Sequence, residues 1–301
     1  MDAATLPWLL RSMLFVPGDS EKKLARAADV RADALVLDLE DSVAPARKAH
    51  ARALVQEFLR GSRRRDRTLW VRINALDAPE CLDDLAAVVP GRPDGIVLPK
   101  PRSAADVAEL GLRMEALERR CGTPEGATRV IPIATETPAA VLTLGGYLDG
   151  TRRLAALTWG AEDLSVALGA ETNVDERGEW LPAFELARSG CLLAAAGAGV
   201  PAIDTVHTNL RDHAGLERQA RAARRDGFAG KLAVHPEQVE ILNAVFRPTA
   251  DELGYARRVI AAFGAADTGV AVVDGRMLDR PHLTRAQRVV DLAARLDGAA
   301  P

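Results

Sequence analysis

Short apolar runs alternate with segments of helical periodicity along most of the chain. Eight of these runs are bounded by Gly, Pro or charged residues, as strands usually are, and they cover residues 12–18, 34–41, 68–75, 95–101, 129–137, 154–164, 201–207 and 230–236. Between the runs, apolar residues recur every three or four positions and predict helices over residues 21–30, 46–60, 80–88, 103–120, 139–148, 182–197, 214–226 and 236–245. This alternation predicts parallel strands joined by helical crossovers.

The strands are apolar along nearly their whole length, which indicates a sheet covered on both faces. A closed TIM-type (β/α)₈ barrel accounts for eight such units better than an open doubly wound sheet, the alternative that the pattern alone allows. The tail predicts a helix over 249–263, a strand over 269–273 that turns at Asp274-Gly275, and a helix over 283–296. We therefore expect a barrel domain over residues 1–246 and a C-terminal extension over 247–301, which caps the barrel or a neighbouring subunit.

Composition changes this picture little. The chain has 301 residues, 48% of them hydrophobic and 27% charged, which is ordinary for a globular enzyme with a large core. A net charge of −3 gives no indication of a nucleic-acid or membrane-surface binder. No apolar run reaches the ~20 residues of a membrane span, and the N-terminus lacks a signal-peptide pattern, so we expect a cytoplasmic protein.

The three cysteines are Cys81, Cys121 and Cys191. Their odd number and the absence of CxxC spacing argue against a disulfide framework and a structural zinc site. We expect free thiols that pack as small apolar side chains.

Ionisable and polar side chains gather where the predicted strands end, which is where TIM barrels carry their active sites. They are Asp38, Glu40, Asp41, Arg72, Asn74, Lys100, Glu136, Glu162, Asp163, Asp204, His207 and His235. Buried charges cost several kcal/mol unless they are paired or bind a metal. So many of them at one end of the barrel favour a binding site over a purely structural role.

Glu136 and the Glu162-Asp163 pair follow neighbouring predicted strands, which lie about 4.8 Å apart. Carboxylates placed in this way can converge on one hard cation. Mg²⁺ accepts one or two protein carboxylates together with water and substrate oxygens, and oxygen ligands alone disfavour zinc. The alternative is that these acids cap the following helices or pair with arginines.

Three further side chains leave two interpretations open. Arg72 has the forked donors that hold a carboxylate or an enolate oxygen, or else it forms an internal salt bridge with Asp38 or Glu40. Lys100 and Lys231 could each form a Schiff base if burial lowers the pKa, or else be ion-paired. His207 and His235 are expected to support loops rather than to bind a metal ion.

Several common motifs are absent from the sequence. There is no GxxxxGK[ST], no GxGxxG after a strand, no GxSxG and no HExxH. These absences argue against a P-loop NTPase, a Rossmann dehydrogenase, an α/β-hydrolase and a zincin metalloprotease.

An ordered set of segments carries a family resemblance. The segments are RSMLFVPGDSEKKLARA, VLDLEDSV, VRIN, LPKP, ETPAAV, GAEDLSVALGA, PAIDTV, GFAGKLAVHPEQV and DGRMLDRP. The sequence closely resembles the HpcH/HpaI aldolase and citrate lyase superfamily, in the citrate lyase beta-subunit-like branch that includes malyl-CoA and citramalyl-CoA lyases. The resemblance runs from about residue 11 to about residue 296.

The resemblance implies roles for individual residues. Glu136 and Asp163 correspond to the metal ligands of the family, and Arg72 corresponds to the arginine that holds substrate oxygens. Asp279 corresponds to an acid/base aspartate that a neighbouring subunit supplies. The positions expected to contact the CoA ester or another part of the ligand are Phe15, Lys22, Arg26, Arg47, Ile203 and Asp204.

The activity implied by the resemblance is metal-dependent Claisen-type cleavage and condensation, with Mg²⁺ as the cation or Mn²⁺ in its place. The substrate would be a malyl-, citramalyl- or citryl-type CoA thioester, and the products a short acyl-CoA and a 2-oxo acid or oxaloacetate. A homotrimer or hexamer with a shared active site is implied as well.

Alternatives are a thioesterase or synthase on the same β-hydroxyacyl-CoA, a pyruvate aldolase acting on free acids, and a citrate lyase beta subunit that acts within a complex on a carrier-protein thioester. Three departures from the family pattern leave the substrate open: His207 stands where relatives commonly carry Tyr, Asn209 where they carry Asp, and Pro101-Arg102 where they carry an acid.

Overall fold

The computed structural model describes residues 8–62, 67–150, 152–265 and 269–298. Their strands are β1 (Ser12–Pro17), β2 (Ala34–Asp38), β3 (Thr68–Arg72), β4 (Gly95–Leu98), β5 (Arg129–Pro132), β6 (Leu157–Thr158), β7 (Ala202–Asp204), β8 (Gly230–Ala233), β9 (Ala271–Val273) and β10 (Arg276–Leu278). The α-helices are α1 (Glu21–Asp29), α2 (Lys48–Gly61), α3 (Cys81–Val88), α4 (Ala104–Arg120), α5 (Pro138–Leu142), α6 (Glu162–Leu168), α7 (Pro182–Gly197), α8 (His213–Asp226), α9 (Pro236–Val245), α10 (Ala250–Gly264) and α11 (Arg280–Leu296). Short 3₁₀ helices are η1 (Pro45–Arg47), η2 (Val89–Gly91) and η3 (Leu144–Asp149).

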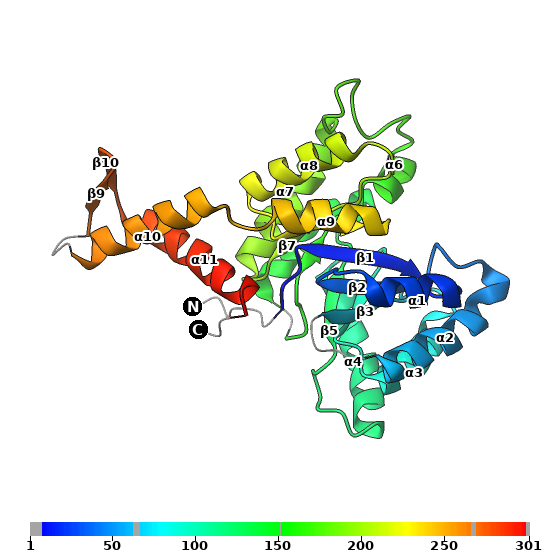
Figure 1. Ribbon diagram of the computed structural model, residues 1–301. Coiled ribbons are helices and arrows are strands. Elements are labelled where there is room, and N and C mark those ends of the chain that lie inside the picture. The colour runs from blue at the N-terminus through cyan, green and yellow to red at the C-terminus, as the bar shows by residue number, and fades with distance from the viewer. Residues whose placement is uncertain (1–7, 63–66, 151, 266–268, 299–301) are drawn as a thin grey trace. The chain divides into compact units, whose positions relative to one another are not determined.

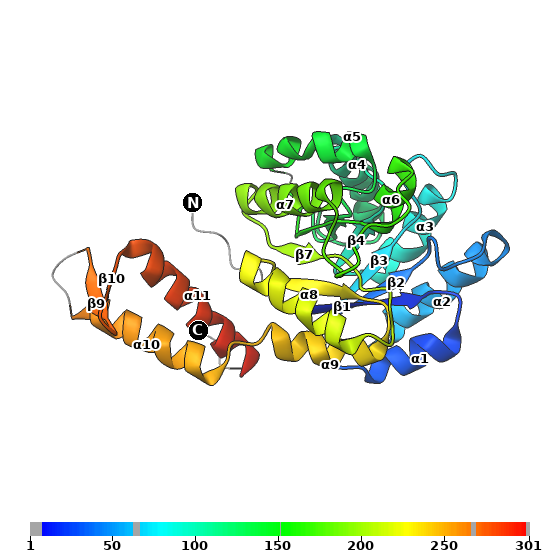
Figure 2. The ribbon, with the colours of Figure 1, turned by 90° about the horizontal axis from the view of Figure 1, so that it is seen from above.

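The first eight strands form one parallel sheet in the order β5-β4-β3-β2-β1-β8-β7-β6. Its two edges meet, because isolated parallel bridges join Val130 to Leu154 and Ile133 to Thr158. A backbone hydrogen bond of 2.7 Å from Ala134 N to Thr158 O strengthens this seam. The sheet is therefore a nearly closed barrel with helices around it (Figures 1 and 2), which confirms the predicted TIM-type fold.

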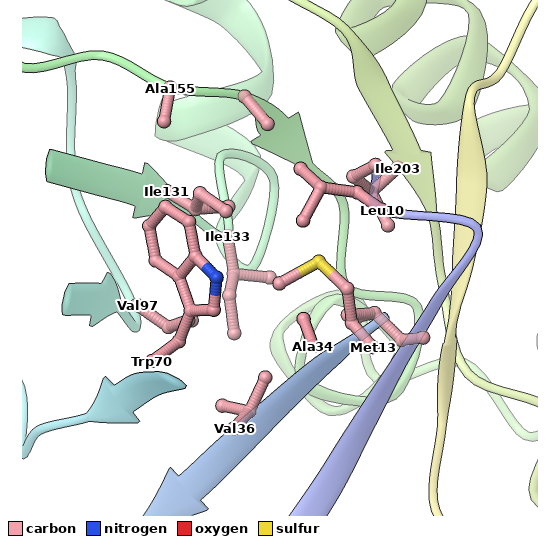
Figure 3. Packing of buried hydrophobic residues seen from close by; sticks show 12 residues of the cluster. Leu10, Met13, Ala34, Val36, Trp70, Val97, Ile131, Ile133, Ala155 and Ile203 are labelled. Carbon is pink, nitrogen blue, oxygen red and sulfur yellow. The ribbon is translucent and has the colours of Figure 1, made fainter. Parts of the chain in front are cut away.

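Apolar side chains fill the interior of the barrel. Figure 3 shows Met13 from β1, Trp70 from β3 and Ile131 from β5 pointing into one cluster. Trp8, which precedes β1, meets Trp70 edge to face with ring centroids 5.6 Å apart. Such a core holds the strands in register and leaves polar chemistry to the ends of the barrel.

Two predicted elements were wrong in their extent. The sixth strand ends at Thr158, and residues 162–168 form helix α6, so Glu162 and Asp163 lie on the first turn of a helix rather than on a strand. The helix predicted over 139–148 is instead α5 followed by η3, with a break at Thr143. Both helical segments are too short for a three- to four-residue periodicity to stand out.

The chain divides into two compact units, Met1–Asn243 and Ala244–Pro301. The second unit contains α10, the β9–β10 hairpin and α11 around a small core of Ala256, Val259, Val273, Leu278 and Ala286. The hairpin turns at Asp274 and Gly275, whose φ values of 51° and 76° suit a two-residue turn. Among the described helices, none has the length and apolar character to cross a bilayer.

Candidate active site

A cavity of about 320 Å³ opens where the barrel strands end. Its walls come from the ends of β1, β2, β3 and β8, from the loops that follow β5 and β7, and from the start of α6. The side chains with the most chemistry among its lining are Asp38, Asp41, Arg72, Glu136, Glu162 and Asp163. The predicted carboxylates and the predicted arginine therefore share one cavity.

Arg72 ends β3 directly opposite Asp38 of β2 in the strand register. Its Nε and Nη2 donate to the two carboxylate oxygens of Asp38, both at 2.7 Å, and its Nη1 lies 2.8 Å from Glu40 Oε2. The internal salt bridge left open by the sequence is thus present. Two of the five guanidinium N–H groups donate to Asp38, and Nη1 forms an ion pair with Glu40. The other N–H groups can serve a ligand because Arg72 also lines the cavity.

The Arg72 pair holds its charges firmly. Burial would raise the pKa of the Asp38 carboxyl, but hydrogen bonds and charge from Arg72 outweigh it and keep that pKa below its ordinary value. Burial would lower the pKa of Arg72, but Asp38 and Glu40 raise it instead. Phe15 covers one face of the guanidinium, with its ring centroid 4.7 Å from the guanidinium carbon. Arg72 is therefore a fixed cation with a set orientation.

Glu136 follows β5 and is 3% exposed. One of its oxygens accepts the backbone N–H of Lys100. Burial raises the pKa of the Glu136 carboxyl well above its ordinary value; the Lys100 N–H opposes this rise, and the negative charges of Asp163 and Glu40 add to it. An acid in such a crowd of like charges is one that a cation would stabilise.

Lys100 brings the acids together from the end of β4. Its ammonium forms an ion pair with Glu40 and lies 3.1 Å from Asp41 and 3.3 Å from Asp163. Since its backbone N–H donates to Glu136, both predicted metal ligands contact this one residue, Glu136 at the backbone and Asp163 at the ammonium. Its backbone is in the left-handed region with φ at 51°, a conformation that costs energy for a side chain other than Gly.

Neither lysine has the properties of a Schiff-base residue. Burial would lower the pKa of Lys100, but Glu40 and the other acids raise it above its ordinary value, so the amine stays protonated. Burial does lower the pKa of Lys231, but that side chain is fully buried, 2.7 Å from Asp204, and it is not part of the cavity wall. The ion-paired alternative is the one observed for both.

The donor set fits a hard divalent cation. Glu136 and Asp163 offer only oxygen atoms, and Asp163 remains 34% exposed to the cavity side. The neighbouring Glu162 is engaged elsewhere, since it accepts a hydrogen bond of 2.9 Å from Asn173. Within the residues that the structure describes, no three His, Cys, Asp or Glu side chains form a metal-binding group. A cation would thus bind two carboxylates and complete its shell with water and substrate oxygens.

The residues predicted to contact the ligand fall into two groups. Phe15 lines the cavity, whereas Lys22 and Arg26 are exposed on α1. Arg47 ends η1, the short helix after β2, and its Nε is 2.9 Å from Asp19 Oδ2. Contact of the three basic residues with a ligand stays a prediction.

The other predicted pair, Ile203 and Asp204, is fully buried. The cavity wall is formed instead by the next two residues, Thr205 and Val206. Direct contact of the pair with a ligand stays a prediction, and the structure shows a different use of Asp204. It accepts hydrogen bonds from Trp159 Nε1 and Lys231 Nζ, both at 2.7 Å.

Two residues of the cavity wall were not predicted from the sequence. Trp159 and Gly160 precede the acidic pair and line the cavity. A Cβ at position 160 would lie 2.7 Å from Glu136 Cγ, so this glycine makes room for the carboxylate. Its place directly before Ala161 and the two acids could have been noticed, but the contact with Glu136 joins positions far apart in sequence.

The two histidines expected to support loops do so. His207 Nδ1 lies 3.0 Å from Gln219 Oε1, and the backbone carbonyl of His207 accepts a hydrogen bond of 2.9 Å from Gln238 Nε2. His235 is part-exposed, and its ring nitrogen accepts the backbone N–H of Glu237 at 3.3 Å.

Asp279 belongs to the second compact unit, where it caps α11 and bonds His282 Nδ1 at 2.5 Å. The cavity lining comes from the first unit. The acid/base role of Asp279 therefore stays a prediction about assembled subunits.

Comparison with known proteins identifies the family. Residues 11–236 match the family described as HpcH/HpaI aldolase/citrate lyase. The citrate lyase subunit beta of Escherichia coli K12 is 37% identical over 286 residues, covering 94% of this chain and 93% of the relative. A (3S)-malyl-CoA thioesterase of Cereibacter sphaeroides is 34% identical, with 93% of each chain covered.

Solved structures agree with these relatives. The CitE protein of Mycobacterium tuberculosis, in complex with magnesium, acetoacetate and coenzyme A, superimposes with a TM-score of 0.78 at 32% identity, over 94% of this chain and 97% of that one. A citrate lyase beta subunit from the same organism, complexed with oxaloacetate and magnesium, gives a TM-score of 0.68 at 31% identity, over 80% of this chain and 98% of that one. With the barrel and its acid-lined cavity, these matches place the chain in the HpcH/HpaI aldolase/citrate lyase family, among the citrate lyase beta subunit-like CoA-ester lyases.

Proposed function

We propose that this protein is a Mg²⁺-dependent lyase that reversibly cleaves a malyl-, citramalyl- or citryl-type CoA thioester. The products would be a short acyl-CoA and a 2-oxo acid or oxaloacetate. The observation that carries the proposal is that Glu136 and Asp163 both contact Lys100, in the cavity that Arg72 also lines.

Each residue has a defined part in this proposal. Glu136 and Asp163 hold the cation. When bound, the cation polarises the substrate's carbonyl oxygens and stabilises the negative charge that develops as the carbon–carbon bond breaks. Arg72 directs its free N–H groups at the same developing charge, and the Asp38 pair keeps it from turning away.

A base must remove the hydroxyl proton of the substrate, and the same group must return a proton in the condensation direction. Asp279 of a neighbouring copy is the proposed base, in a homotrimer or hexamer. Lys22, Arg26 and Arg47 lie on the segments that follow β1 and β2, so their charges suit the CoA phosphates. The magnesium, acetoacetate and coenzyme A of the M. tuberculosis protein support this assignment.

Thioester hydrolysis is the second candidate function. The C. sphaeroides relatives, which are (3S)-malyl-CoA thioesterases, favour it. In that reaction or in a synthase, water attacks the thioester of the same substrate and free CoA is released. Action within a complex on a carrier-protein thioester is a third candidate, favoured by the citrate lyase subunit beta of E. coli.

The test is a turnover assay of the purified protein with malyl-CoA and with citramalyl-CoA, in Mg²⁺ and in EDTA. We expect Mg²⁺-dependent release of an acyl-CoA and a 2-oxo acid, and loss of that activity in Glu136→Ala. Glu125→Ala is the control, because Glu125 is an exposed partner of Arg119 and does not line the cavity. Free CoA as the product would replace the lyase with the thioesterase. Absence of turnover with both esters would contradict cleavage of free malyl-CoA and citramalyl-CoA, and would favour a carrier-protein substrate or another acyl chain.

A further inference from the structure

A buried ion pair lies behind the wall of the cavity. The ammonium of Lys231 on β8 and the carboxylate of Asp204 on β7 are 2.7 Å apart, and both side chains are almost completely excluded from solvent. Arg188 of α7 adds a second cation, with its Nε 3.5 Å from Asp204. Burial lowers the pKa of Lys231, and the charge of Asp204 opposes that shift. Removing both charges from water costs free energy, so a contribution to stability does not by itself explain why the pair is present.

Asp204 also contacts the indole of Trp159. Asp204 Oδ1 accepts the Nε1 hydrogen at 2.7 Å, a charge-assisted bond of the strong kind. The indole is fully buried and meets Trp180 edge to face, with centroids 4.8 Å apart and planes at 76°. Two independent contacts thus fix the plane of this ring.

Trp159 is the last residue before the segment that carries the metal-site chemistry. Gly160, next in the chain, packs against Glu136, and its N–H donates to Thr135 Oγ1 at 3.1 Å. Three residues further on, Asp163 lies on the first turn of α6. A rotation of the Trp159 backbone would therefore move both predicted metal ligands, one through packing and one through the chain.

We propose that the Lys231–Asp204 pair positions Trp159, and through it the segment from Gly160 to Asp163, so that the two metal-site carboxylates are held in a geometry ready for the cation. The inference rests on the function proposed above and deepens it. Lys231, Asp204 and Trp159 are positioning residues in this proposal: they act through the cavity wall, and the first two are not part of its lining. Lys231 fixes the Asp204 carboxylate, and the carboxylate fixes the indole.

Two double variants separate positioning from the mere presence of a buried pair. Asp204→Asn with Lys231→Met removes both charges but leaves an amide oxygen to accept the indole hydrogen. Asp204→Leu with Lys231→Met removes the same charges and also the acceptor. Aspartate, asparagine and leucine share the same branched side-chain skeleton, although the methyl groups of leucine take more space than the carboxylate oxygens. Arg188 keeps its 2.9 Å contact with Asp226 in either variant.

The first readout is the near-ultraviolet circular dichroism of the protein without added metal. The Trp159–Trp180 pair should contribute a band that Trp180→Phe removes. We expect the Asn/Met variant to retain the band and the Leu/Met variant to lose it. This measurement does not depend on the lyase activity.

The second readout is Mg²⁺ binding by calorimetry. We expect the Leu/Met variant to bind Mg²⁺ at least about 10-fold more weakly than wild type, as changes behind metal ligands usually do. The Asn/Met variant should stay within about 3-fold of wild type. If the Leu/Met variant does not fold, Trp159→Phe replaces it, with Trp180→Phe as the matched control, and only Trp159→Phe should weaken Mg²⁺ binding.

Equal dichroism and equal Mg²⁺ affinity in the two double variants would overturn the positioning role. A wild-type protein that neither binds Mg²⁺ nor turns over a CoA ester would instead overturn the function proposed above. In that event the dichroism of the two variants still decides whether the pair orients Trp159.

Discussion

At the scale of single residues, Gly160 shows how little space the site leaves for an additional side-chain atom. Its α-carbon faces the side chain of Glu136, and an added Cβ would lie 2.7 Å from Glu136 Cγ and 3.1 Å from Ile133 Cγ2. Both neighbours are almost completely buried, and both line the cavity. A methyl group here would displace the carboxylate rather than simply fill a gap.

We therefore expect Gly160→Ala to lower kcat about 100-fold, because a displacement of about 1 Å at a reacting group has effects of this size. Gly145→Ala is the control, since a Cβ there meets nothing within 4 Å and φ is not positive. Steady-state kinetics at saturating Mg²⁺ and thermal melting would be measured on both. Full activity in Gly160→Ala would show that Glu136 does not need its present place.

Asp163 and Glu162 are adjacent but differ in their surroundings. Asp163 faces Lys100, whereas Glu162 is held by Asn173. We expect Asp163→Asn to raise the Mg²⁺ concentration needed for half-maximal activity at least about 10-fold, because one of two anionic ligands is lost. Glu162→Gln should leave that concentration unchanged. A Mg²⁺ titration of activity measures both, and the reverse order would assign the metal to Glu162.

Residue identity at strand ends could be predicted from sequence, but residue pairing could not. Arg72, Glu136 and Asp163 were found because they stand next to apolar runs, and a barrel brings such positions to one end. The Asp204 contacts with Trp159 and Lys231 join β7 to β8 and to the residue that follows β6, so no local pattern indicates them. Short-range periodicity contains no information on such partners.

At the scale of elements, the seam between β5 and β6 is pinned at the end of the barrel away from the cavity. Glu118 near the end of α4 pairs with Arg153, with Nη2 and Oε2 2.7 Å apart. Its carboxylate also accepts the backbone N–H groups of Gly126 and Thr128, both at 2.9 Å. The Arg153 carbonyl in turn accepts the N–H of Val130 on β5. Helix, loop and strand are thereby tied together by one buried carboxylate.

This carboxylate predicts an acid-labile contribution to stability. Burial would raise the pKa of Glu118, but Arg153 and the backbone donors lower it to about 2, from 4.5. A lowered folded-state pKa means that the stabilisation is complete above pH 4.5 and is lost as the pH falls toward 2. Glu118→Gln should therefore cost about 3 kcal/mol at pH 7, and its difference from wild type should shrink below pH 4.5.

Urea unfolding from pH 7 to pH 3 measures this difference. Glu125→Gln is the matched control, because Glu125 pairs with Arg119 at 2.8 Å but both side chains are more than half exposed. The control should change the free energy of unfolding by less than about 1 kcal/mol. A Glu118 effect that does not vary with pH would indicate a packing defect instead of lost charge.

Element boundaries were harder to predict than element order. The apolar run that forms β6 continues into residues of α6, so the sequence pattern of the run does not reveal where the strand ends and the helix begins. Gly160 and the two acids at the start of α6 mark that change only after the fact, since acids favour the first turn of a helix. The eight-fold alternation, by contrast, is repeated along the chain and survives such local errors.

At the scale of the whole molecule, the chain carries two kinds of chemistry on two compact units. The first unit contains the acid-lined cavity, and the second contains Asp279 at the start of α11. The proposed shared site requires that the second unit of one subunit serves the cavity of another. The sequence does not indicate which surface the second unit contacts, because no periodic pattern encodes the contact between copies.

Subunit complementation tests this arrangement. Glu136→Ala and Asp279→Ala should each be inactive alone. When the two are co-expressed, sites that combine an intact Glu136 with an intact Asp279 from a neighbour should form, and about a quarter of wild-type activity should return if subunits mix at random in a ring. Co-expression of two different cavity variants, Glu136→Ala and Asp163→Asn, is the control and should give no more activity than Asp163→Asn gives alone. Absence of recovery in mixed oligomers would place each complete site within one chain.

The position of the Lys100 ammonium has one further consequence, for how the site binds and releases a cation. Its ammonium already contacts Glu40, Asp41 and Asp163, so the acids have an internal placeholder whenever no divalent ion is bound. This one ammonium offsets only part of their negative charge, so before a divalent ion binds it reduces the repulsion between these carboxylates without removing it. Binding of a divalent cation would then replace the single positive charge of the ammonium with a double one. Its release would only require the Lys100 side chain to return to Asp163.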